Sequence, residues 1–175
     1  NFSAHQRRIL PFSRHSPMIQ MARDETVLAG LMGNTIQVWK LISGQNPLHL
    51  ANIKISRFEA IRSFSISPSG SLVSVLTASE FKLFHVNLQS GSIERIETSS
   101  LRLAKRATFP HLVLFASEER ILAFNSQEII QLSLDLASLT VQQLESIKTP
   151  CSPCRVTIDS SNCLILSTDR QVFKQ

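Results

Sequence analysis

The stretch that decides the fold is Ile61–Val86, IRSFSISPSGSLVSVLTASEFKLFHV. It predicts three short strands separated by two tight turns. The first strand, residues 61–67, alternates apolar and polar side chains, and the third, residues 80–86, alternates again. Between them, residues 72–76 form a short apolar run, typical of a strand that is covered on both faces. In the turn at residues 67–70, proline presets φ and glycine supplies the positive φ that a tight reversal needs.

A fourth short strand completes the unit. Residues 87–92 are polar and predict a turn, and Ile93–Ile96 then predicts a strand. Four antiparallel strands in about 40 residues match the size of one β-propeller blade. The sequence therefore predicts an all-β chain built from blades of this kind.

The unit recurs along the chain with a regular period. The third-strand anchors Trp39, Phe84 and Leu132 are 45 and 48 residues apart, and the first-strand positions Ile66 and Ile158 are 92 residues apart. A period near 46 lies close to the 40–45 residues of a WD-repeat blade. The aligned third strands are TIQVWKL (35–41), EFKLFHV (80–86) and EIIQLSL (128–134).

The repeat predicts a WD-repeat-type β-propeller that holds about three and a half blades of a larger ring. We expect residues 1–175 to be part of one propeller domain. The predicted blades cover approximately 15–54, 58–98, 105–146 and, incompletely, 153–175. Residues 128–144 are rich in Gln, Leu and Ser and also allow a helix, but their alternating apolar pattern fits strands at least as well. An open stack would expose edge strands, so we expect further blades to complete the ring.

Composition limits the class of protein. Hydrophobic residues make up 43% of the chain, enough for a packed core, and no apolar run is long enough to span a membrane. The chain starts at Asn1 without a signal sequence, which predicts that it begins inside a longer protein. Three cysteines do not make a disulfide framework, which favours a reducing compartment.

The charge suggests an acidic partner. The net charge is +5 and the isoelectric point is about 9.6, which favours nucleic acid first. The charges are scattered, however, and an ordinary solvated surface explains them equally well. The tightest groups supply the candidate contacts with RNA or another acidic partner: Arg7, Arg8, Arg102, Lys105 and Arg106.

No pattern in the sequence predicts catalysis, a cofactor or a metal. Cys151 and Cys154 form a CxxC pair and Cys163 follows, but a zinc site lacks a fourth ligand at suitable spacing. A redox CxxC would open a helix, whereas this pair precedes a predicted strand. Loop or core cysteines are the favoured interpretation, and the five histidines are dispersed. We therefore predict neither enzymatic activity nor a small-molecule substrate.

Several motifs resemble one family of WD-repeat proteins. They are RRILPF (7–12), TIQVWKL (35–41), LHLANIK (48–54), EAIRSFSISPSGSLVSVLTASEFKLFHVN (59–87) and ERI (94–96). Together they look like the second propeller of the cirhin family, which belongs to the UtpA subcomplex of the small-subunit processome. The resemblance covers roughly residues 7–97 and fades to the blade period beyond Arg106. Trp39 stands where WD repeats carry their Trp, with Lys40 in place of Asp, and we expect it to pack as a third-strand aromatic.

The resemblance implies a non-enzymatic scaffold in the nucleolus. Its implied partners are the other UtpA proteins and the 5′ external transcribed spacer of pre-ribosomal RNA, in support of 18S rRNA maturation. One alternative is a protein-only interaction propeller in another complex, such as a trafficking coat or a ubiquitin-ligase adaptor. A second alternative is an enzyme on a propeller scaffold, which would need titratable groups that converge at the central channel.

Overall fold

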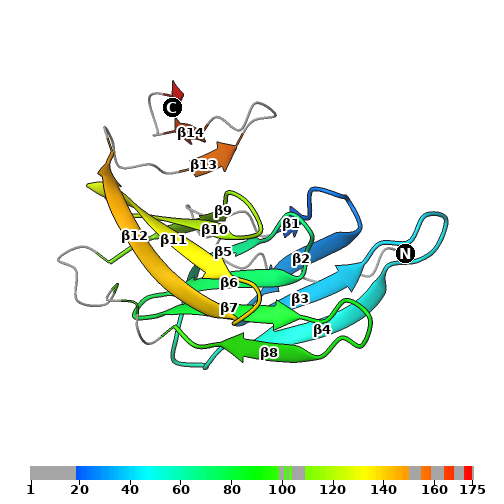
Figure 1. Ribbon diagram of the computed structural model, residues 1–175. Coiled ribbons are helices and arrows are strands. Elements are labelled where there is room, and N and C mark those ends of the chain that lie inside the picture. Colours follow the sequence, from blue (N-terminus) through cyan, green and yellow to red (C-terminus); the bar gives the residue numbers. More distant parts are fainter. Residues whose placement is uncertain are drawn as a thin grey trace, which may run out of the picture.

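Four antiparallel sheets make up the structure, a computed structural model, which describes residues 19–98, 101, 103 and 109–149 and three strands between 155 and 174. In every sheet the strands follow one another in chain order, each paired with the next (Figure 1). Within this described part, there is no long apolar helix of the kind that crosses a bilayer. The prediction of an all-β partial propeller is confirmed, and the extent of the propeller domain over residues 1–175 stays a prediction.

Each sheet forms one blade. Blade one comprises β1 (Ile19–Met21), β2 (Val27–Met32), β3 (Thr35–Lys40) and β4 (Leu48–Lys54). Blade two comprises β5 (Ile61–Ile66), β6 (Leu72–Thr77), β7 (Phe81–Val86) and β8 (Ile93–Ile96). Blade three comprises β9 (Leu112–Phe115), β10 (Arg120–Phe124), β11 (Glu128–Asp135) and β12 (Thr140–Lys148). In blade four the structure describes three strands, β13 (Arg155–Ile158), β14 (Leu164–Ser167) and β15 (Val172–Lys174). The helix that residues 128–144 also allowed is excluded, since they form all of β11 and the first part of β12.

The core lies between the blades. One apolar cluster joins blades one and two, a second joins blades two and three, and a third extends from blade three to Val156 of blade four. Blade two is therefore covered on both faces, and all six residues of β6 are buried. In β7, Phe84 and Val86 face blade one while Phe81 and Leu83 face blade three. Both faces of β7 are therefore buried, because each meets a neighbouring blade.

Polar side chains tie the innermost strands of successive blades together. The Gln20 amide donates to the Phe64 carbonyl at 2.8 Å and accepts from the Ile66 amide at 3.2 Å. In the next pair, the hydroxyl oxygens of Ser63 and Ser65 accept from the backbone amides of β9, at Val113 and Phe115, each at 3.1 Å. Alternating serines usually indicate a solvent-exposed face of a strand. Here they are buried and accept hydrogen bonds from backbone amides of the innermost strand of the following blade.

The turns between the first two strands of blades one, two and three also meet. Gly70, in the turn between β5 and β6, has φ of +81°, and a Cβ added there would lie 2.5 Å from Cβ of Val27 in blade one. The Arg23 amide donates to the Pro68 carbonyl at 2.9 Å, and the Glu118 carboxylate accepts from the Ser69 amide. A glycine is needed at position 70 both for its backbone angle and for this close approach.

The predicted packing of Trp39 needs correction. Trp39 is only half-buried and lies on the face of blade one that points away from blade two, where its ring meets His49 edge-on at 6.1 Å. Its neighbour Val38 takes the buried side and has no exposed area. Strand alternation sends the two residues to opposite faces.

We expect Phe84→Ala to lower the free energy of unfolding by about 3–5 kcal/mol, because it empties a packed site between two blades. Trp39→Ala should cost about 1 kcal/mol, since its ring faces away from blade two. Urea unfolding at low protein concentration measures both. Equal losses for the two variants would contradict the assignment of their faces.

Ser65→Ala should cost about 1–3 kcal/mol, because it leaves the buried Phe115 amide without its acceptor. Ser90→Ala, in the exposed turn before β8, provides the matched control and should be close to neutral. Thermal unfolding compares the pair. A neutral Ser65→Ala would show that the polar ties between innermost strands do not stabilise the blade stack.

Candidate functional site

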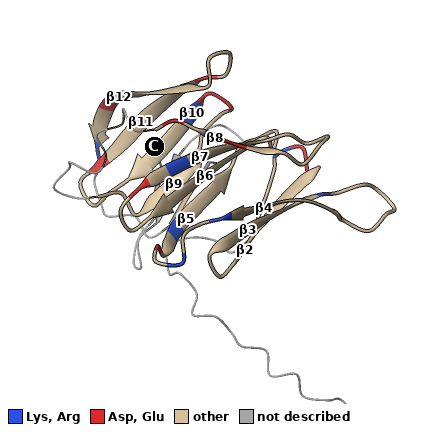
Figure 2. Ribbon diagram, turned by 90° about the horizontal axis from the view of Figure 1, so that it is seen from below, with Lys and Arg blue, Asp and Glu red and all other residues tan. Residues whose placement is uncertain are grey.

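The basic residues predicted to contact RNA lie outside the described part of the chain. Arg7, Arg8, Arg102, Lys105 and Arg106 all fall in undescribed positions, as do Cys151, Cys154 and Cys163. Over the described residues, lysines and arginines are interspersed with acidic residues rather than gathered in one block (Figure 2). No finding on the described residues therefore tests these five positions as contacts.

Strand order divides the connections of the blades between two faces. In an up-and-down sheet, the turn between strands two and three lies at the same end as the link to the next blade. We call this end the connection face. It carries the turns β2–β3, β6–β7 and β10–β11, together with the links that follow β4 and β8.

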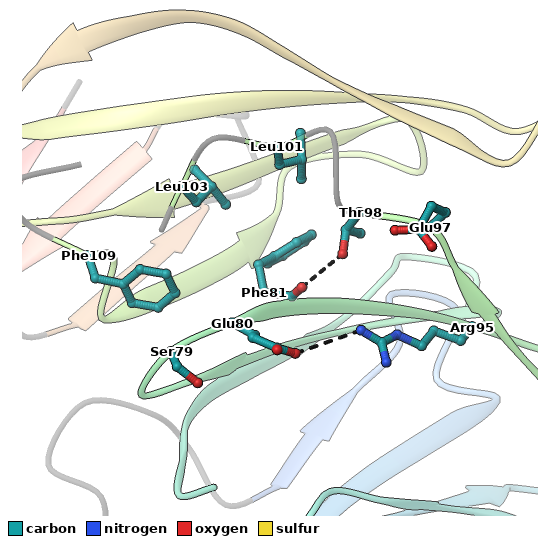
Figure 3. A pocket seen from close by; sticks show the side chains of 9 residues that line it. All are labelled: Ser79, Glu80, Phe81, Arg95, Glu97, Thr98, Leu101, Leu103 and Phe109. Carbon is teal, nitrogen blue, oxygen red and sulfur yellow. Dashed lines mark hydrogen bonds and ion pairs between the residues drawn. The ribbon is translucent and has the colours of Figure 1, made fainter. Parts of the chain in front are cut away.

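A hollow lies on the connection face between blades two and three. It has a volume of about 230 Å³ and is lined by nine residues from the β6–β7 turn, the end of β8 and the link to blade three (Figure 3). They are Ser79, Glu80, Phe81, Arg95, Glu97, Thr98, Leu101, Leu103 and Phe109. The hollow is thus built by blade two and the link that leads to blade three.

The floor of the hollow is apolar and its position is fixed by hydrogen bonds. Phe81 and Leu103 are buried and belong to the cluster between blades two and three, with Leu101 and Phe109 packed against it. The Thr98 hydroxyl donates to the Phe81 carbonyl at 3.0 Å, and the Leu101 amide donates to the Thr98 carbonyl at 3.1 Å. These bonds join the link to the first residue of β7.

The turn that carries the rim is also held locally. The Thr77 hydroxyl oxygen accepts from the amides of Ser79 at 3.3 Å and Glu80 at 3.0 Å. This places the Ser79 hydroxyl and the Glu80 carboxylate at the mouth of the hollow (Figure 3). The rim is thus polar and solvent-exposed, above an apolar floor.

A network of four charges runs from the rim into the interface between blades one and two. The Glu80 carboxylate lies 3.3 Å from Nζ of Lys82 and 3.8 Å from Arg95, and Lys82 also pairs with Glu59. Lys82 is buried, with 7% of its surface exposed, so its ammonium depends on the two carboxylates. The network is neutral as a whole, with Arg95 at its solvent-exposed end.

The chemistry of the lining is that of a site for a small polar molecule. Two carboxylates, Glu80 and Glu97, and the Arg95 guanidinium surround an apolar floor, as in many ligand pockets. A guanidinium binds carboxylate or phosphate oxygens, and a carboxylate can exchange protons with a bound molecule. Among the described residues, no cluster of three or more His, Cys, Asp or Glu side chains is placed to hold a metal ion.

The sequence pattern did not reveal this hollow. Its rim residues come from positions 79 to 98, and Leu103 and Phe109 follow in the link, without a recognisable motif. Glu80 stood at the start of a predicted strand, and only the pairing of β7 with β8 brings it close to Arg95. The repeat predicts that such a turn and link lie on one face. It does not predict which side chains meet there.

Comparison with known proteins supports the fold and not the predicted family. No protein-family model matches the chain, and the search of curated proteins gives no match. A Bacteroides uniformis protein assigned as a 6-phosphogluconolactonase is similar in structure, with a TM-score of 0.61 and 16% identity over 92% of this chain and 50% of its own. A functionally unknown protein of Desulfotomaculum acetoxidans has a TM-score of 0.67, 13% identity and coverages of 90% and 50%. The periplasmic gluconolactonase of Pseudomonas aeruginosa has a TM-score of 0.54, 15% identity and coverages of 77% and 40%. The chain spans about half the length of these structures or less.

These comparisons contradict the resemblance to the cirhin family. The three neighbours named above are bacterial and two carry lactonase names, so the predicted scaffold role in ribosome biogenesis, the nucleolar location and the RNA binding are wrong. The prediction that the chain is not an enzyme is contradicted for the same reason. The matching motifs misled because residues such as Phe84 and Gly70 pack blades and form turns, which unrelated propellers also require. The partner proteins that the resemblance implied stay untested predictions.

Lys82→Met combined with Glu59→Leu should leave the free energy of unfolding within about 1 kcal/mol, because apolar side chains replace both members of the pair. The matching position of blade three is Ile130, which is fully buried. Glu59→Leu should cost more, about 3 kcal/mol, since it removes one of the two carboxylates that compensate the buried charge. Urea unfolding ranks the two variants. A double variant that costs more than Glu59→Leu alone would show that the ion pair itself stabilises the blade interface.

Proposed function

We propose that the chain forms half of a propeller hydrolase that opens small sugar lactones, with the hollow between blades two and three as its ligand site. The observation that carries the proposal is the combination of an Arg95 guanidinium with the carboxylates of Glu80 and Glu97 over an apolar floor. The similarity in fold to proteins named as 6-phosphogluconolactonase and gluconolactonase supports the choice of substrate class.

Each group of lining residues binds a different part of the sugar. Arg95 binds the anionic or strongly polar end of the sugar, because a guanidinium donates several parallel hydrogen bonds. Ser79 and Thr98 add hydroxyl groups that match the hydroxyls of a sugar. The apolar floor of Phe81 and Leu103 takes the less polar face of the ring.

The reaction itself needs water and one base. The oxygen of a water molecule adds to the lactone carbonyl carbon while the Glu97 carboxylate takes up the water proton. The tetrahedral intermediate collapses when the ring C–O bond breaks, and the leaving alkoxide takes a proton back from Glu97. The product is an open hydroxy acid. Glu80 is assigned to the rim instead, where its carboxylate is paired with Lys82 and Arg95.

The test is hydrolysis of gluconolactone and its 6-phosphate by the purified chain, followed by acid release at constant pH and corrected for spontaneous opening. We expect saturable acceleration, and Glu97→Gln should lower kcat by about 100-fold. Arg95→Gln should mainly raise KM, most strongly for the phosphorylated lactone.

Glu94→Gln is the matched control, because this exposed carboxylate of β8 does not line the hollow. It should leave both constants unchanged. An unmodified chain that opens the lactones no faster than buffer would overturn the proposal, and equal losses in Glu94→Gln and Glu97→Gln would overturn the assigned base.

A further inference from the structure

The Glu80 carboxylate stands between two cations that differ in their exposure to solvent. It lies 3.3 Å from Nζ of Lys82, whose side chain is 9% exposed, and 3.8 Å from a guanidinium nitrogen of Arg95, whose side chain is 58% exposed. Figure 3 shows the carboxylate turned toward Arg95 at the mouth of the hollow. One carboxylate therefore contacts a buried ammonium on one side and a solvent-exposed guanidinium on the other.

The negative charge of Glu80 is fixed in place. Its backbone is held in the turn, since its amide donates to the Thr77 hydroxyl oxygen at 3.0 Å and its carbonyl accepts from the Thr77 amide at 2.9 Å. Its carboxylate is held by Lys82, because withdrawing it would leave the buried ammonium with the single carboxylate of Glu59. A ligand that enters the hollow therefore meets this charge and does not displace it.

The Arg95 guanidinium, in contrast, is available to a ligand. An exposed ion pair such as that of Arg95 with Glu80 is weak, because water screens the charges and two flexible side chains must be held together. A bound molecule can replace this contact and receive hydrogen bonds from the guanidinium. The molecule then lies close to both the guanidinium and the carboxylate that remains beside it.

These two groups together suit a hydroxyl better than a phosphate. A hydroxyl can donate to the Glu80 carboxylate while its oxygen accepts from Arg95. A phosphate ester carries a charge of about −1.5 to −2 near pH 7, and its oxygens act as acceptors. A phosphate placed at Arg95 is therefore attracted by the guanidinium but repelled by the neighbouring carboxylate.

We propose that Glu80 determines the charge specificity of the hollow: as the fixed counterion of Arg95, it favours an uncharged sugar lactone over a phosphorylated one. Lys82 does not line the hollow, and it acts as a positioning residue that holds the Glu80 carboxylate at the rim. The inference rests on the proposed function, because it concerns which lactones that same site prefers.

The experiment compares KM for gluconolactone and its 6-phosphate in the unmodified chain and in Glu80→Gln, which keeps an acceptor oxygen but removes the charge. We expect the unmodified chain to have the lower KM for the uncharged lactone. In Glu80→Gln, the KM of the phosphorylated lactone should fall about 10-fold, because the repulsion is lost, while that of the uncharged lactone stays within about twofold. An equal change in both KM values would overturn the proposal.

Three further variants separate this effect from general ones. Glu94→Gln removes the same charge from an exposed position of β8, and Glu59→Gln removes the other carboxylate that pairs with Lys82, yet neither residue lines the hollow. Both should leave the ratio of the two KM values within about twofold. Glu80→Asp keeps the charge and should retain the preference of the unmodified chain. A shift in Glu94→Gln as large as that in Glu80→Gln would overturn the proposal, since net charge alone would then explain it.

Binding of two unreactive sugars tests the specificity without catalysis. Glucose and glucose 6-phosphate are titrated into the chain by calorimetry, and Glu80→Gln should tighten only the phosphorylated sugar, by about 10-fold. That result in a chain that opens no lactone would overturn the hydrolase activity and support the charge specificity. Lactone opening with an unchanged preference in Glu80→Gln would overturn the charge specificity alone. No lactone opening together with no binding of either sugar would overturn both.

Discussion

The packing of one sheet face against the next is the constraint on which the whole structure depends. A four-stranded sheet of this size cannot bury enough apolar surface alone, so each blade is stable only between neighbours. Blade two shows the completed arrangement, with every residue of β6 buried. Polar ties such as those of Gln20 and Ser65 then set the spacing of the innermost strands, because the backbone groups that they meet are out of reach of water.

The hollow follows from the same constraint. Where two blades diverge at the connection face, the link between them must cross the opening, and its side chains line what remains. Apolar residues of the link continue the inter-blade core as a floor, while the β6–β7 turn supplies polar groups at the rim. A blade stack therefore places a small site beside a rigid core, which is the arrangement that binding and catalysis favour.

One position of the repeat is filled by an ion pair in blade two and by an apolar side chain in blade three. Lys82 and Ile130 occupy the same place in successive blades, facing the preceding blade in each case. Blade three fills the place with an apolar side chain, whereas blade two uses an ammonium and two carboxylates. Through Glu80, the ion pairs of Lys82 connect the interface of blades one and two to the rim of the hollow.

The amino-acid sequence by itself determined the repeat, the strands and the turns, since alternation of apolar residues and the Pro and Gly of the Ser67–Gly70 turn are local properties. It did not determine the burial of Ser63 and Ser65, the outward face of Trp39 or the meeting of Glu80 with Arg95. Those features depend on which blade lies against which face, and that relation exists only once the sheets have stacked. The misassigned family has the same cause, because residues that pack blades are shared by propellers of unrelated function.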